Sequence, residues 1–162
     1  MYIVGSVGEG PGGEPAPNGM IADWVMQVSF QPRLLAVSFE NDSTSLARIR
    51  VNGAFTVNVL AGDLDGMELA RGFLQPYEGS KVRGRSVEAA ARKHDKLAGV
   101  AYRVTESGCP VLEEALAWLE CEAQEFVAAG DHTLVIGRVL DGAVDHQGEP
   151  LTSTFTGWTY SG

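Results

Sequence analysis

The sequence predicts a mainly β protein with a few helices, of the α+β type, built on a closed or split antiparallel β-barrel. Two observations predict this class. Some seven short segments have the composition and spacing of strands, whereas only two or three segments have helical spacing. The strands and helices do not alternate regularly, as they would in a doubly wound parallel sheet. At 162 residues, the chain 1–162 is expected to form one domain.

The chain begins with a short apolar strand, Met1–Val7, followed by a Gly/Pro-rich loop, Gly8–Pro17. The start lacks the basic residues and the apolar length of a signal peptide. The glycines of Gly5–Gly13 resemble a dinucleotide-binding loop, but Pro11 and the following glycines stand where that motif needs a helix. A hairpin loop is therefore expected.

A turn and two strands are predicted next. Asn18-Gly19 favours a tight turn because both residues tolerate positive φ. Met20–Phe30 is expected to form one irregular strand, which Gln31-Pro32 ends. The apolar run Leu34–Phe39 has the length of a strand and indicates a central position in the sheet.

A polar cluster then precedes a helical pattern. Asn41–Ser45 is rich in N-capping residues, and Leu46–Val51 follows helical spacing, so a helix begins here. Two interpretations stay open. The cluster is an ordinary N-cap, or its hydroxyls and the first N–H groups of the helix form an anion site.

The middle of the chain predicts a strand and two helices. Phe55–Leu60 alternates like a half-buried strand, and Asp63 caps a helix over Leu64–Phe73. A polar loop, Gln75–Arg85, carries three cations and is either a solvated loop or a lid over a nucleotide. Ser86–Leu97 is expected to be helical.

The last third predicts a hairpin and a closing strand. In Ala115–Val127 the small and apolar residues alternate with charged ones at period two, which places Cys121 inside the barrel as a small hydrophobe. Gly130-Asp131 forms a turn, and Thr133–Leu140 returns as the partner strand. Two further strands are expected over Val100–Val104 and Leu151–Tyr160.

Charge and composition exclude several functions. Twelve basic and twenty-one acidic residues give a net charge of −9, which opposes binding to nucleic acid or to an anionic membrane. The two cysteines lack metal or disulfide spacing, which fits a reducing cytoplasm. The three histidines are scattered, so no metal site is expected. No nucleophile motif such as GxSxG is present.

Several motifs occur together in a characteristic order. Asn18-Gly19-Met20, Pro32 and Ser43-Thr44-Ser45 are followed by NGAFTVNVL, LARGF, CPVLEEALAWLEC, GDHTLVIGRV and GEPL. Over about Tyr2–Tyr160, this order resembles the flavin reductase-like, FMN-binding split-barrel family. The resemblance implies an FMN-binding split barrel of the antiparallel Greek-key type.

The resemblance also implies a function, which is NAD(P)H-dependent reduction of FMN, with FAD as the alternative flavin. The implied partners are a second copy of the chain in a homodimer and a monooxygenase or other redox partner that receives the electrons. The implied flavin-binding residues are Asn18, Met20, Ile21, Ala22, Asp23, Trp24, Phe39, Glu40, Asn41, Ser43, Thr44, Ser45, Arg71, Gly72 and Phe73.

Two residues distinguish the alternatives that remain. His132 by itself is typical of a polar turn residue. The resemblance instead places it beside the exposed face of the flavin, where it would be catalytic. Trp24 departs from the small hydroxyl residue of many reductases and slightly favours a non-enzymatic FMN-binding electron carrier. A flavin domain of a larger flavoprotein is the third interpretation.

Overall fold

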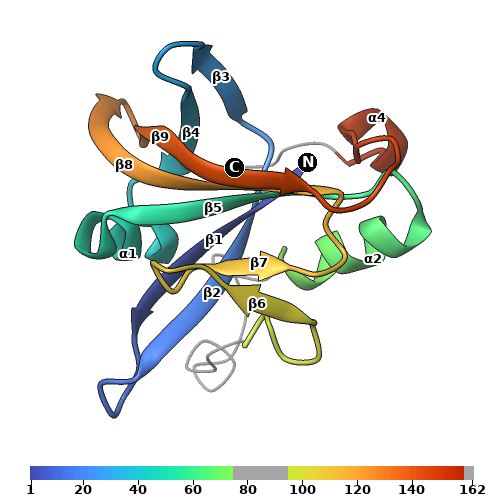
Figure 1. The fold of residues 1–162 in the computed structure, drawn as a ribbon, viewed down its shortest axis with the longest axis horizontal. Helices are drawn as coiled ribbons and strands as arrows, with labels where there is room; N and C mark the ends of the chain where they lie inside the picture. The colour runs from blue at the N-terminus through green and yellow to red at the C-terminus, as the bar shows by residue number, and fades with distance from the viewer. Residues whose placement is uncertain (75–94, 159–162) are drawn as a thin grey trace.

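The computed structural model describes residues 1–74 and 95–158, and nine strands dominate them (Figure 1). Three helices accompany the strands: α1 (Thr44–Asn52), α2 (Leu64–Gly72) and the short α4 (Ser153–Thr156). The strands are β1 (Tyr2–Glu9), β2 (Pro15–Ala22), β3 (Val25–Ser29), β4 (Leu34–Glu40), β5 (Ala54–Val59), β6 (Tyr102–Val104), β7 (Pro110–Leu112), β8 (Ala117–Ala129) and β9 (His132–Val144). The mainly β prediction is confirmed.

Seven strands form one antiparallel sheet in the order β2-β1-β5-β8-β9-β4-β3. Among the described residues, β2 and β3 are its two edges, although they are consecutive in the chain. Asp23 and Trp24 are the only residues between them. The strongly curved sheet thus brings its two ends to one short connection.

The inner face of the sheet packs on α1. Val4, Val37, Phe55 and Cys121 form the centre of this core, and Leu46 and Ile49 of α1 contribute from the helix. A second core, which includes Ile3 and Phe73, lies on the other side of β1. The small buried role that the alternation of β8 predicts for Cys121 is confirmed.

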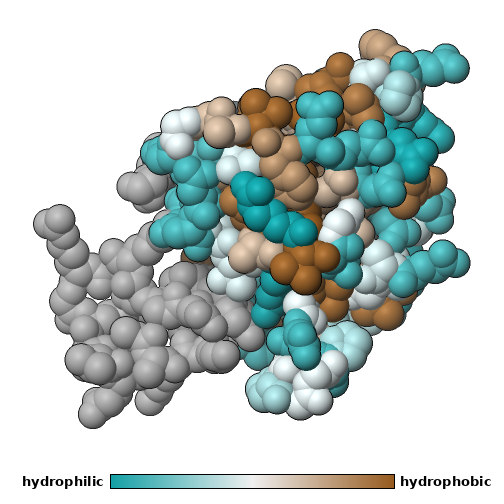
Figure 2. Space-filling view, turned by 90° about the vertical axis from the view of Figure 1, so that its left-hand side faces the viewer, coloured by the Kyte–Doolittle hydropathy of each residue, from teal (hydrophilic) through white to brown (hydrophobic). Residues whose placement is uncertain are grey.

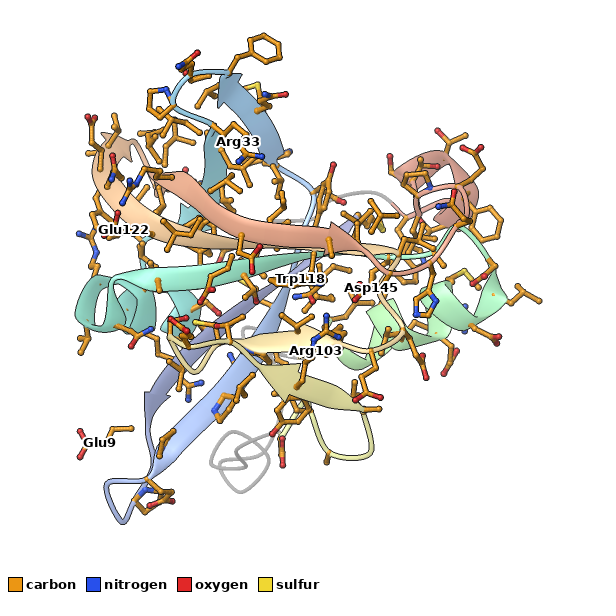
Figure 3. All side chains as sticks on the ribbon, in the orientation of Figure 1. Glu9, Arg33, Arg103, Trp118, Glu122 and Asp145 are labelled. Atoms are coloured by element: carbon orange, nitrogen blue, oxygen red, sulfur yellow. The ribbon has the colours of Figure 1, made fainter. Side chains whose placement is uncertain are left out.

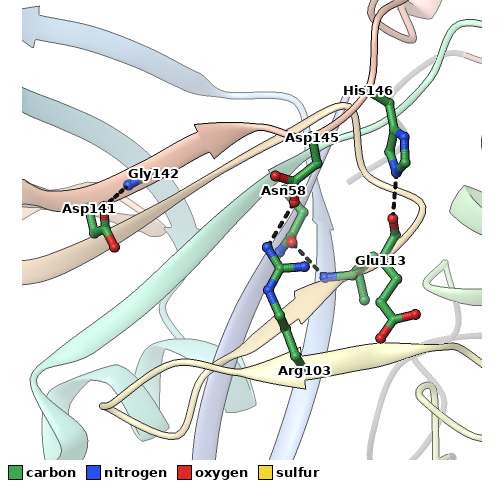
Figure 4. Close-up of polar contacts among 8 residues, drawn as sticks. Asn58, Arg103, Glu113, Asp141, Gly142, Asp145 and His146 are labelled. Atoms are coloured by element: carbon green, nitrogen blue, oxygen red, sulfur yellow. Dashed lines mark hydrogen bonds and ion pairs between the residues drawn. The ribbon is translucent and has the colours of Figure 1, made fainter.

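A two-stranded ribbon, β6–β7, is attached to the barrel by a buried amide. The Nδ2 of Asn58 donates to the backbone oxygens of Ile3 and Pro110, and its Oδ1 accepts from the N–H of Leu112 at 2.9 Å (Figure 4). The guanidinium of Arg103 lies 5.3 Å from the ring centroid of Trp118 and pairs with Asp145 (Figure 3). The ribbon is therefore fixed by polar contacts from both of its strands.

Most predicted elements are present, with small shifts in their bounds. Leu34–Phe39 is flanked by a strand on each side, and Ser43 and Asp63 are the N-caps of α1 and α2. The Gly130-Asp131 turn joins β8 to β9, with Gly130 at a φ of 68°. The predicted strand over Val100–Val104 is shorter, and β7 beside it was missed.

Three predictions are wrong. Asn18-Gly19 lies inside β2, and the turn lies at Gly10–Glu14, because β1 and β2 continue to pair to the tip of their hairpin. The single strand over Met20–Phe30 is interrupted at Asp23 and Trp24, where the chain leaves one edge of the sheet for the other. The described part of Leu151–Tyr160 contains α4 and no strand, because Thr152 caps a helical turn.

Two predictions lie largely or wholly outside the described residues: the polar loop Gln75–Arg85 with its three cations, and the helix over Ser86–Leu97. Within the described ranges, no helix is both long enough and apolar enough to cross a membrane.

Candidate functional site

An open groove of about 1030 Å³ lies on the outer face of β3, β4 and β9. Five residues of the predicted site line it: Asp23, Trp24, Glu40, Asn41 and His132. The structure thus brings together the strand break after β2, the end of β4 and the start of β9. The start of β9 is about a hundred residues from the other two segments in the sequence.

Strand alternation explains which side chains reach the groove. In β4, Leu35, Val37 and Phe39 face the core, whereas Ala36, Ser38 and Glu40 line the groove. In β9, His132 is the register partner of Glu40, and Leu134 is the partner of Ser38. Phe39, a predicted flavin-binding residue, is 1% exposed and lies beneath the groove rather than in its wall.

His132 and Trp24 both line the groove and lie against each other. Their ring centroids are 5.2 Å apart and the planes are tilted by 45°. The Nδ1 of His132 lies 2.7 Å from the Oδ1 of Asp131, and this contact lowers the pKa of the Asp131 carboxyl. Because Nδ1 is engaged, Nε2 is the ring nitrogen left for a ligand.

The start of α1 provides polar groups next to the groove. Ser43 accepts from the N–H of Leu46 at 3.4 Å and donates to the Sδ of Met20 at 3.6 Å. The N-cap interpretation is thereby confirmed. The cap leaves the N–H groups of Thr44 and Ser45, in the first turn, directed toward the end of the helix. The anion site at this position stays a prediction.

The other predicted residues lie away from the groove wall. Asn18 is 3% exposed, and it is the register partner of Ser6 in β1. The Oγ of Ser6 is buried without a hydrogen-bond partner among the described residues. This orphaned hydroxyl lies on the face of β1 that packs against α1.

Two short segments complete the placement of the predicted residues. Ile21 packs against the second core, and Ala22 belongs to the first. Arg71 is exposed and pairs with Glu68 at 2.9 Å, and Gly72 beside it is exposed. Phe73 is buried against Gly19.

The groove suits a planar ring better than a free anion. Trp24, Val25, Met26, Ala36 and Leu134 give it apolar walls, and its rim carries carboxylates. These carboxylates, on Asp23, Glu40, Asp42 and Asp131, repel a phosphate, so a phosphate fits only toward the start of α1. The residues present therefore fit a planar apolar ring in the groove, and a phosphate site at the start of α1 stays a prediction.

Sequence reasoning missed part of the groove. Met26, Ala36, Ser38 and Leu134 lie on the outer faces of their strands. The period-two pattern of β4 could have identified Ala36 and Ser38 as neighbours of Glu40. The approach of β9 to β4 could not be derived from the pattern, because it joins residues about a hundred positions apart.

Comparisons with known proteins agree with this geometry. The family profile described as "Flavin reductase like domain" matches residues 1–159. The chain is similar to a high molecular weight rubredoxin of Moorella thermoacetica, with 34% identity over 85% of the chain and 55% of that protein. It is also 31% identical to a flavin reductase of Pseudomonas putida, over 83% of the chain and 68% of that protein.

A solved structure shows the same similarity. The NADH:FAD oxidoreductase SgcE6 of Streptomyces globisporus C-1027 superimposes with a TM-score of 0.66 and 26% identity, covering 88% of this chain and 74% of that one. The chain spans about half the length of the rubredoxin that it matches.

Proposed function

Because the chain belongs to the flavin reductase-like domain family, we propose that it is an NAD(P)H-dependent reductase of FMN, with FAD as the alternative flavin. One observation carries this proposal: the groove is lined by the neighbouring rings of Trp24 and His132 and by Asn41 and Asp42, which directly precede the N-cap of α1. The groove thus offers a flat apolar surface, an imidazole at its mouth and N–H donors for a phosphate.

The side chains of the groove have separate roles in this proposal. Trp24 and Leu134 exclude water from the ring, and the Nε2 of His132 contacts the nicotinamide nucleotide. Ser43, Thr44 and Ser45 hold the flavin phosphate through hydroxyls and the first N–H groups of α1. When bound, the flavin accepts the hydride, so the protein needs only to position the two rings and keep water away.

Purified protein loaded with FMN is expected to be yellow and to lose its visible flavin absorbance when NADH or NADPH is added without oxygen. The chain positions the nucleotide at His132, so bleaching should saturate with nucleotide concentration. Dithionite serves as the control, since it reduces flavin without a nucleotide site. Bleaching by dithionite but by neither nucleotide would contradict the reductase proposal.

A second candidate function is an electron-carrying flavin domain. The similarity to the Moorella rubredoxin, of which the chain spans only 55%, favours it, as does the aromatic Trp24 in the groove. In this case, the flavin receives electrons from a protein partner rather than from a nucleotide. The anaerobic experiment separates the two candidates directly.

The protein is further proposed to act as a homodimer. Trp24, Met26, Val28 and Phe30 of the β3 region are 53%, 62%, 44% and 85% exposed. Apolar residues gather at the top of the face drawn in Figure 2, at the height of β3 and β4 in Figure 1. A row of large apolar side chains at the edge of a sheet is typical of an interface between copies.

Light scattering at micromolar concentration is expected to give twice the mass of one chain. In Phe30→Asp, the measured mass is expected to fall toward that of one chain. A charge introduced into an apolar interface loses its water without gaining a partner, which weakens dimer formation. On a free surface the same charge stays hydrated and does not affect dimer formation. Leu64→Asp is the matched control, because Leu64 is 71% exposed on α2. A parent protein with the mass of one chain would contradict the dimer.

Three further points stay predictions. A monooxygenase or other redox partner would take the electrons from the reduced flavin. The chain 1–162 is taken as one flavin-binding domain. A cytoplasmic location is compatible with Cys109 and Cys121, which are buried and not joined to each other.

A further inference from the structure

The turn that carries His132 is tied to α1 by three side chains, Asn41, Thr133 and Arg50, which we call the bracket. The Nδ2 of Asn41 donates to the backbone oxygen of Gly130 at 3.0 Å, and its backbone N–H donates to the oxygen of Asp131 at 3.0 Å. The Oγ1 of Thr133 donates to the Oδ1 of Asn41 at 2.8 Å. Both ends of the Asn41 amide are therefore used inside the protein.

Thr133 connects the two ends of α1. Its hydroxyl also accepts from the Nη2 of Arg50 at 3.4 Å, and the Arg50 guanidinium lies 4.7 Å from the ring centroid of Phe126 in β8. Asn41 lies just before the N-cap of α1, and Arg50 lies in its last turn. Thr133 is buried, with 4% of its surface exposed.

The turn is also held by strand pairing, because His132, the first residue of β9, is in register with Glu40 of β4 and with Ala129 of β8. Gly130 is exposed, and the carboxylate side chain of Asp131 is 93% exposed. The contact between the exposed Asp131 carboxylate and the His132 ring, which is 15% exposed, restrains the ring only weakly. The bracket adds side-chain hydrogen bonds to this backbone pairing, and Thr133 is its buried member.

We infer that Thr133 is a positioning residue: through Asn41, its hydroxyl fixes the turn so that the His132 ring stays beside Trp24 at the mouth of the groove. This inference rests on the proposed function, because the position of the His132 ring matters for activity only if the ring contacts the nicotinamide nucleotide. Asn41 then acts by holding the turn rather than by binding the flavin. The start of α1 and the imidazole are thereby joined in one rigid unit.

Thr133→Val tests the inference, because valine keeps the shape of threonine and removes its hydroxyl. Thr133→Ser retains the hydroxyl and should behave like the parent. Thr56→Val is the matched control: Thr56 is fully buried in β5, and its hydroxyl donates to the backbone oxygen of Pro110, away from the groove. If the two valine variants lose equal thermal stability, a change at His132 in Thr133→Val alone cannot be explained by lost stability.

The first measurement is the side-chain ¹H–¹⁵N spectrum of His132 in flavin-free protein, assigned by comparison with His132→Ala. In Thr133→Val, the His132 signals are expected to broaden or divide, because the ring samples more than one position. The KM for the nicotinamide nucleotide should rise about fivefold, as expected for one lost hydrogen bond. Flavin affinity should stay within about twofold, and Thr133→Ser and Thr56→Val should match the parent.

An unchanged His132 spectrum in Thr133→Val would overturn the inference, as would the same spectral change in Thr56→Val. The spectrum does not depend on catalysis, so it decides the inference even in a protein that no nucleotide reduces. Failure of the parent to react with NADH and NADPH would instead overturn the proposed function.

Discussion

His132→Ala is expected to slow anaerobic reduction of the bound flavin by NAD(P)H roughly ten- to a hundredfold at subsaturating nucleotide. The reason is the loss of one donor at the mouth of the groove, which costs about 1.5 to 3 kcal/mol when the acceptor is charged. Flavin affinity and the flavin spectrum should change little, because in the proposed function the flavin ring contacts the apolar walls of the groove. Stopped-flow absorbance at several nucleotide concentrations measures the effect.

His146→Ala is the matched control for this variant. The Nε2 of His146 lies 2.9 Å from the backbone oxygen of Glu113, beside the β6–β7 ribbon and outside the groove (Figure 4). This variant should react like the parent, and dithionite should reduce all three proteins equally fast. If His132→Ala reacts with both nucleotides at the parental rate, His132 is a turn residue only.

Replacing Ser43 and Ser45 together by Ala should weaken FMN binding by about 1 to 3 kcal/mol, the usual range for hydrogen bonds to a charged acceptor. Riboflavin, which lacks the phosphate, should lose much less. Titration of the flavin-free protein with each ligand, followed by flavin fluorescence, gives the two affinities. The result to compare is the loss of FMN affinity relative to the loss of riboflavin affinity, because changes that affect both ligands cancel in this comparison.

Loss of a helix cap is the alternative explanation, since Ser43 also accepts from the N–H of Leu46. Asp63→Ala removes the corresponding cap of α2, where the carboxylate accepts from the N–H of Gly66 at 2.8 Å. It should reduce stability by about 1 kcal/mol and leave the preference for FMN unchanged. Equal weakening of FMN and riboflavin in the Ser43/Ser45 variant would show that these residues only cap α1.

The sequence predicted the parts of the fold that depend on local chemistry. Ser43 and Asp63 cap their helices because a short polar side chain precedes a helical pattern, and Cys121 is buried because it lies on the apolar side of an alternating strand. The tight turn at Asn18-Gly19 was wrong for a related reason. The local preference of this pair for a turn is overridden by pairing of β2 with β1.

The site was harder to predict than the fold. The resemblance pointed to Trp24 and His132, and the structure brings them within 5.2 Å of each other. The alternation of β4 could have separated Phe39 from Glu40. The pattern could not show that the amide of Asn41 is used by the turn, because this depends on which strand packs beside β4. Which residues contact flavin stays a prediction.

The order of the strands in the sheet also has a consequence for how the chain folds. The β1–β2 and β8–β9 hairpins join neighbouring segments and can form early, whereas β4 pairs with β9 across about a hundred residues. Closing so long a loop costs entropy before any contact repays it, so folding rate is limited by such distant pairings. The groove takes its walls from both sides of the β4–β9 pairing. We therefore expect it to be assembled late, after the rest of the sheet has begun to form.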